Sequence, residues 1–241
     1  MGVPARVRIA LLECDHTDPD LRHLDGDYGD MHAALLAAHG PQIELERVDV
    51  VGGQPLPAPG AVDGYLITGS RYDAVDDRPW IRDLAALVRS AHAAAVPTVG
   101  ICFGHQLIAH ALGGRVERAE VGWGVGVHPA TLTPIGTHRL GNPERFHLLL
   151  SHQDQVLALP PGAQLLATSD HAPVAAFAVG SMLGFQGHPE FSPGYLAALL
   201  DSRTDRIPGA VLDAAHRSLD TPTQHAEVAG WMVAHLTGGR R

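Results

Sequence analysis

The chain contains no lysine, and all 17 of its basic residues are arginines. This absence excludes every mechanism that needs the lysine amine. Such mechanisms include a Schiff base, a pyridoxal phosphate anchor, a serine–lysine dyad and the phosphate-binding lysine of a P-loop. We therefore do not expect the chain to activate ATP through a P-loop of its own.

Cysteine is scarce as well. Cys14 and Cys102 are the only two, which is too few for a disulfide framework or for a zinc site made of cysteines. No apolar run reaches the length of a membrane span, and the apolar run near the start is too short and too interrupted by arginine for a signal peptide. We expect a cytoplasmic protein without a membrane partner.

Basic charge is not in excess. The formal net charge is −9, so the sequence lacks the electrostatic footprint of a nucleic-acid-binding protein. The length of 241 residues, 45% of them hydrophobic, is enough for one large domain with a full core. An acidic segment at residues 15–30 either lines the mouth of a pocket or forms a solvated loop.

Up to residue 114 the sequence alternates between segments typical of buried strands and segments typical of amphipathic helices. The clearest helix has one apolar face, made of Ile81, Leu84, Leu87, Val88 and Ala91. Strands are expected at residues 7–12, 43–50, 63–70 and 97–101, and helices at residues 30–40, 78–96 and 103–114. This order predicts a parallel sheet covered by helices.

After residue 114 the pattern changes to short alternating runs and tight turns, with a hairpin turn expected at Gly180-Ser181. Helices are expected at residues 194–202, 209–219 and 225–236, where they cover a sheet edge or form a dimer contact. We predict a single α/β domain over residues 1–241, with its core at about 7–200 and a helical extension at 201–241. Its sheet is mostly parallel and flanked by helices, with a small antiparallel side element.

The most informative segment surrounds Cys102. Gly100 and Gly104 lie two residues before and two residues after it, between an expected strand and an expected helix. This is the pattern of a nucleophile elbow, in which the flanking residues must be small because the turn brings them together. The helix dipole would favour a thiolate there, and the N–H of Phe103 would face a developing oxyanion. A second donor is expected at Gly69, at the end of a neighbouring strand.

A buried structural thiol explains the glycines about as well, so a base is needed to decide. Cys14 lacks such flanking residues and is expected to be a core or loop thiol. Among 16 histidines, His188 follows an apolar run and a glycine, and Glu190 lies close enough to orient its ring. His105, in the first helical turn after the cysteine, is expected to cap the helix or to line the pocket.

Four segments now stand in a familiar order: GYLITGS (64–70), GICFGHQ (100–106), SHQDQV (151–156) and GFQGHPEF (184–191). Together they resemble the class I glutamine amidotransferases of the Cys-His-Glu type. The second matches the nucleophile motif G-x-C-x-G-x-Q, and the fourth matches G-x-Q-x-H-P-E. The resemblance is closest to the GMP synthase-like branch of stand-alone domains, which includes γ-glutamyl peptidases.

The resemblance implies a flavodoxin-like fold and hydrolysis of a γ-glutamyl amide through a cysteinyl thioester. It implies that Cys102 is the nucleophile, His188 the base and acid, and Glu190 the group that orients the histidine. Gly69 and Phe103 would form the oxyanion hole. The glutamyl group would be held around Gly104, Gln106, Ser151, His152 and Asp154. No metal and no organic cofactor is expected.

The sequence leaves the leaving group open. A glutaminase would release ammonia from glutamine, with a separate synthase subunit as one candidate partner, and this is the first expectation. A γ-glutamyl peptidase would release an amine or peptide. A DJ-1-like thiol or binding module would share the elbow without amidase activity. One departure from the family concerns its oxyanion loop, commonly Gly-Gly-Pro, which reads Gly69-Ser70-Arg71 here.

Overall fold

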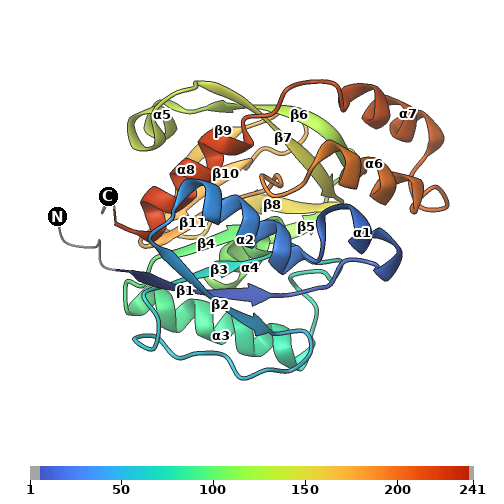
Figure 1. Cartoon of the computed structure of the whole chain (residues 1–241). Coiled ribbons are helices and arrows are strands. Elements are labelled where there is room, and N and C mark those ends of the chain that lie inside the picture. The colour runs from blue at the N-terminus through green and yellow to red at the C-terminus, as the bar shows by residue number, and fades with distance from the viewer. Residues whose placement is uncertain (1–5, 239–241) are drawn as a thin grey trace.

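The computed structural model describes residues 6–238 (Figure 1). The ends of the expected domain, residues 1–5 and 239–241, lie outside the described residues. The strands are β1 (Val7–Glu13), β2 (Ile43–Asp49), β3 (Gly64–Ile67), β4 (Thr98–Ile101), β5 (Arg115–Arg118), β6 (Gly124–Leu132), β7 (Arg145–His152), β8 (Asp154–Ala158), β9 (Gln164–Thr168), β10 (Ala176–Val179) and β11 (Met182–Phe185). The helices are α1 (Arg22–Asp25), α2 (Tyr28–His39), α3 (Pro79–Ala93), α4 (Phe103–Ala111), α5 (Pro134–Leu140), α6 (Pro193–Asp201), α7 (Gly209–Ser218) and α8 (His225–Leu236).

The centre of the fold is a nine-stranded sheet in the order β2-β1-β3-β4-β11-β10-β9-β6-β7. The first five strands of this order are parallel, and their arrangement is the one found in flavodoxin-like sheets. The α/β fold class is therefore confirmed. The remaining strands pair antiparallel and extend the same sheet, while β5 and β8 form a separate two-stranded sheet.

Helices cover both faces of the parallel strands, because the side chains of each strand alternate between two apolar clusters. Ile9 and Leu11 of β1 pack in the cluster that contains the apolar side chains of α2 and α8. Ala10 and Leu12, from the same strand, pack in the cluster that contains those of α3 and α4. Figure 1 shows the C-terminal helix α8 lying beside α2 over the sheet. This helix covers a face of the sheet rather than the sheet edge expected from the sequence.

A hairpin at the switch from parallel to antiparallel pairing confirms the turn expected at Gly180-Ser181. Strands β10 and β11 pair antiparallel on either side of it, with Val179 opposite Met182. Gly180 has a φ of +56°, which glycine adopts without strain. The turn returns the chain so that β11 runs parallel to β4, and the residues that follow β11 therefore emerge at the same sheet edge as Cys102.

None of the helices within residues 6–238 has the length and the apolar character that crossing a bilayer requires. The cytoplasmic location and the single-domain organisation stay predictions.

Candidate active site

The candidate site lies at the carboxyl ends of the parallel strands, where open α/β sheets bind ligands. Cys102 directly follows β4, Gly69 follows β3, and the segment with His188 follows β11. Each of these strands is short and fully buried, so the chain leaves the core at fixed points. The sheet topology thus brings together three residues that are far apart in the sequence.

The backbone at Cys102 has the geometry of a sharp elbow. Its φ of 50° and ψ of −97° lie outside the regions that residues with a side chain favour. A Cβ on Gly100 would lie 2.4 Å from the carbonyl carbon of Gly104, and one on Gly104 would lie 2.5 Å from the backbone oxygen of Ile67. Backbone atoms cannot move aside, so both positions require glycine. The turn presents the Cys102 side chain at the start of α4.

His188 and Glu190 form a buried pair beside the cysteine. His188 Nδ1 lies 2.7 Å from Glu190 Oε1, and the imidazole ring stacks on Phe191 with centroids 4.0 Å apart. Burial lowers the pKa of His188, but the charges of Glu190 and of a Cys102 thiolate outweigh it and raise that pKa to about 10. The ring is therefore an imidazolium at neutral pH, held in one orientation.

A third group supports Glu190 from behind. His32 Nε2, on the buried face of α2, lies 3.8 Å from Glu190 Oε1, and His32 Nδ1 bonds the backbone oxygen of Tyr28 at 2.9 Å. Although burial raises the pKa of Glu190, the charges of His188 and His32 hold it below its usual value. The carboxylate is thus ionised where it faces the imidazolium. Sequence patterns gave no sign of His32, because α2 reaches the site only through the tertiary fold.

The backbone around Cys102 offers donors for a negative oxygen. Phe103 is the first residue of α4, and the first N–H groups of a helix have no acceptor within it. Gly69 lies so close that a Cβ there would be 2.9 Å from His188 Cε1 and 3.8 Å from Cys102 Cβ. Both residues expected for an oxyanion hole therefore adjoin the cysteine.

The segment SHQDQV lies across the cavity from the elbow. Gln106 Nε2, one turn into α4, donates to the backbone oxygen of Asp154 at 2.6 Å and to Gln186 Oε1 at 3.2 Å. Gln186 Nε2 in turn donates to Cys102 Sγ at 3.6 Å. Gln106 and Gln186 thereby tie the cysteine to the start of β8. Gln186 belongs to the segment GFQGHPEF, but the sequence analysis did not single it out.

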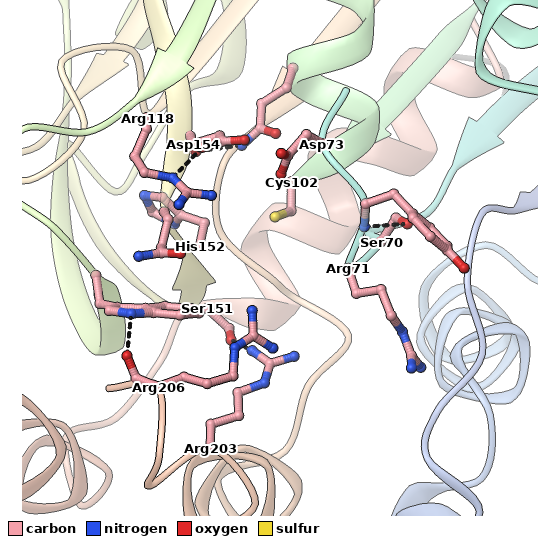
Figure 2. A pocket seen from close by; sticks show the side chains of 14 residues that line it. Ser70, Arg71, Asp73, Cys102, Arg118, Ser151, His152, Asp154, Arg203 and Arg206 are labelled. Atoms are coloured by element: carbon pink, nitrogen blue, oxygen red, sulfur yellow. Dashed lines mark hydrogen bonds and ion pairs between the residues drawn. The ribbon is translucent and has the colours of Figure 1, made fainter. Parts of the chain in front are cut away.

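Cys102 opens into a cavity that is charged at both ends (Figure 2). Asp73, Asp154 and Arg118 line one end, and Arg203 and Arg206 line the other. Burial and the neighbouring Asp154 carboxylate raise the pKa of Asp73 to about 6. Asp154 and Ser151 were expected from the sequence. The other charged residues carry no motif: Arg118 is the last residue of β5, and Asp73, Arg203 and Arg206 lie in loops and turns.

Two histidines near the candidate site, His152 and His105, are buried. Burial lowers the pKa of His152 well below its usual value, with a further contribution from His171, and leaves it neutral at the cavity wall. His105 is fully buried, and its ring packs against Phe177 with centroids 5.0 Å apart. The expectation that His105 caps a helix or lines the pocket is wrong, because the first turn of α4 points its side chain at strands β10 and β11.

The acidic segment 15–30 proves to support the cavity wall. Asp15 Oδ2 accepts hydrogen bonds from the Arg71 backbone N–H at 2.9 Å and from Arg71 Nε at 2.8 Å. Asp27 caps the start of α2 and bonds His16 Nδ1 at 2.9 Å. The loop Gly69-Ser70-Arg71, which departs from the family pattern, is therefore held by this segment.

Comparisons with known proteins agree with the fold. A sequence model described as glutamine amidotransferase class-I matches residues 59–201. γ-Glutamyl peptidase 5 of Arabidopsis thaliana is 33% identical over 201 residues, which cover 80% of each chain. The GMP synthase [glutamine-hydrolyzing] of Thermomicrobium roseum is 42% identical over 110 residues, which cover 44% of this chain and 20% of that protein.

Solved structures have the same architecture. A glutamine amidotransferase from Thermotoga maritima aligns with a TM-score of 0.73 at 18% identity, covering 96% of each chain. A glutamine amido transferase from Methylobacillus flagellatus aligns with a TM-score of 0.73 at 24% identity, covering 99% of this chain and 96% of that one. At these identities the likeness concerns the fold.

Proposed function

The chain belongs to the class-I glutamine amidotransferase family, and we propose that it hydrolyses the amide bond of a γ-glutamyl compound through a thioester on Cys102. The observation that carries this proposal is the buried His188–Glu190 pair, 2.7 Å apart, beside a cysteine in a strained elbow. Strain and paired buried charges are costly to the fold, and such features concentrate at catalytic sites.

In the first half of the reaction, the Cys102 thiolate attacks the γ-carbonyl carbon and forms a C–S bond. The carbonyl oxygen becomes an oxyanion, which the backbone N–H groups of Gly69 and Phe103 stabilise. When the tetrahedral intermediate collapses, the C–N bond breaks and His188 gives its proton to the leaving nitrogen. The products of this half are a free amine and a γ-glutamyl thioester.

In the second half, neutral His188 takes a proton from water, and the resulting hydroxide attacks the thioester carbonyl. The C–S bond breaks, glutamate leaves, and Cys102 returns as a thiolate beside an imidazolium. Glu190 keeps the same ring nitrogen protonated throughout, so His188 works through the nitrogen that faces the cysteine. The cycle is balanced with water as the only co-substrate.

The glutamyl group would lie along the Gln106–Asp154 side of the cavity. Gln106 is buried and fixes the backbone of Asp154, whose carboxylate faces the pocket. Gly104 and His152 complete that wall in the proposal. Ser151, which was expected there from the sequence, accepts a hydrogen bond from Arg203 at the other end of the cavity.

The leaving group separates two versions of this function. Release of ammonia from glutamine, the first expectation from the sequence, stays a prediction. The relatives named γ-glutamyl peptidases match over 80% of this chain, whereas the glutamine-hydrolysing GMP synthase matches over 44%. This difference in coverage favours release of an amine or peptide.

A thiol-sensing module without amidase activity would need the elbow but not the histidine and carboxylate. The orientation of His188 by Glu190, with His32 behind it, supports the hydrolase.

The test is steady-state hydrolysis of glutamine and of γ-glutamyl-alanine by the wild type and by Cys102→Ala and His188→Ala. We expect glutamate release from at least one of the two compounds and a loss of more than about a thousandfold in each variant. The chemically related α-glutamyl-alanine should not be cleaved. Undiminished release by Cys102→Ala would refute the proposal.

A further inference from the structure

Arg203 is a cation that lacks a carboxylate partner in residues 6–238. It lies in the turn after α6 and is half-buried. Its one side-chain hydrogen bond goes from Nη1 to Ser151 Oγ, at 2.8 Å. A guanidinium carries five N–H donors, so most of its donors have no partner among the described residues. An uncompensated, partly buried charge of this kind is costly unless a ligand completes it.

The position of Arg203 in the cavity indicates where such a ligand would bind. Arg203 lines the cavity together with Cys102, and Figure 2 shows its guanidinium extending toward the space beside the sulfur. Burial lowers the pKa of Arg203, and the nearby Arg206 and Arg71 add repulsion. Arg71 is neutralised by Asp15, but nothing comparable neutralises Arg203 within the described part of the chain.

A second guanidinium lies at the same end. The Cζ atom of Arg206 is 5.6 Å from the centre of the Trp123 ring, and Trp123 Nε1 donates to the backbone oxygen of Arg206 at 3.1 Å. These contacts hold the turn that carries both arginines against the cavity wall. The end of the cavity near Ser151 is therefore a preformed site for an anion.

The opposite end suits the amino-acid head of a γ-glutamyl group. That head carries an ammonium and a carboxylate, and the wall there offers Asp73, Asp154 and Arg118. Arg118 Nε lies 3.4 Å from Asp154 Oδ1, so both signs of charge lie side by side. In Figure 2 this group and the Arg203–Arg206 pair lie on opposite sides of Cys102. A substrate whose head occupies the first end directs its leaving group toward the second.

We propose that Arg203 binds the carboxylate of the leaving group, so that the preferred substrates are γ-glutamyl amides of amino acids or peptides. Ammonia and simple amines carry no such carboxylate. The inference rests on the proposed hydrolysis at Cys102 and names the substrate class for it.

The experiment compares γ-glutamyl-alanine with γ-glutamyl-methylamide, which has the same scissile bond but no second carboxylate. The wild type should show a higher kcat/KM for the dipeptide, and Arg203→Gln should lower the dipeptide-to-methylamide ratio by about 10- to 100-fold. Arg203→Lys keeps the charge without the planar fork and should lower the ratio less. Arg89→Gln, at an exposed arginine of α3, is the matched control and should leave the ratio unchanged.

Two outcomes would overturn the inference. In one, Arg203→Gln lowers kcat/KM equally for both compounds, as expected if Arg203 bound the glutamyl carboxylate or only stabilised the fold. In the other, the ratio in Arg203→Gln equals that of the wild type. Both leave hydrolysis itself intact. Failure of the proposed function is distinct, because the wild type would then cleave neither compound, or Cys102→Ala would cleave them as well as the wild type.

Discussion

His188 Nδ1 lies 2.7 Å from Glu190 Oε1, and both side chains are buried. The contact has an electrostatic consequence that kinetics can measure. Burial alone would lower the pKa of His188 and leave the ring neutral. The charge of the Glu190 carboxylate is the largest effect that raises this pKa, which is about 10.

We therefore predict a change in the pH profile when Glu190 becomes glutamine. The imidazolium is the acid that protonates the leaving nitrogen, so kcat/KM should fall as the pH rises through the pKa of His188. Removing the negative charge of Glu190 lowers that pKa, and the alkaline limb should move to lower pH. At pH 7, activity should drop by about tenfold or more. The measurement is kcat/KM against pH for wild type and Glu190→Gln.

The control for this profile is Glu227→Gln, because Glu227 is an exposed carboxylate in the first turn of α8. It should reproduce the wild-type limb. If the limb of Glu190→Gln stays at the wild-type pH, the assignment of that limb to His188 is incorrect.

The second prediction concerns the space beside Gly69. A methyl group there would lie 2.9 Å from His188 Cε1, and the His188 ring cannot retreat because it stacks on Phe191 at 4.0 Å. Gly69→Ala should displace the ring and lower kcat/KM by about 100-fold, because a small displacement of a catalytic group lowers the reaction rate strongly. Circular dichroism should show an intact fold.

Gly230→Ala provides the comparison for Gly69→Ala. Its Cβ would meet nothing within 4 Å, and the position lies inside α8. This variant should keep full activity and gain about 1 kcal/mol in the free energy of unfolding. Full activity in Gly69→Ala as well would show that His188 is not confined as described.

The third prediction concerns the strain at Cys102. Its φ of 50° with ψ of −97° favours glycine, and a residue held in such a region costs about 1–3 kcal/mol. Glycine also loses more backbone entropy on folding, by about 0.5–1 kcal/mol. Cys102→Gly should therefore be more stable than Cys102→Ala by about 1 kcal/mol, although both are inactive. Urea unfolding of the two variants measures the difference.

The same pair of substitutions at Cys14 is the control. Cys14 is buried and is not among the residues with positive φ, so glycine should be less stable than alanine there. If the alanine variant is more stable than the glycine variant at Cys102 as well as at Cys14, the elbow stores no strain.

The elbow and its neighbourhood could be predicted from the sequence because their determinants are local. Gly100 and Gly104 are required by contacts with backbone atoms, and Gly180 by a positive φ. Such requirements place glycine at fixed positions in the sequence, where a motif can be recognised. The parallel pairing of β1, β3 and β4 can likewise be predicted, from the alternation of strands and helices in the sequence.

Other parts of the fold are set by tertiary pairing. The antiparallel strands read correctly as short alternating runs, but their sequence does not say that they continue the main sheet through β9–β10. Helix α5 was missed inside this region, although Thr133 caps it and Pro134 opens it. Threonine and proline are also common in turns, so this part of the sequence is as typical of a turn as of a short helix.

The charged ends of the cavity could not be predicted from the sequence either. Asp73 and Arg203 lie in a loop and a turn, more than a hundred residues apart, and no spacing connects them. What makes Arg203 informative is the absence of a carboxylate near it within residues 6–238, which only a folded chain reveals.

The central claim is that a γ-glutamyl group passes through Cys102. The most direct measurement is mass spectrometry of the protein after acid quenching within the first turnovers on excess γ-glutamyl-alanine. We predict an added γ-glutamyl mass that maps to the peptide containing Cys102, leaves Cys14 unmodified and is absent from Cys102→Ala. Turnover without any adduct on Cys102, together with undiminished turnover by Cys102→Ala, would contradict the account.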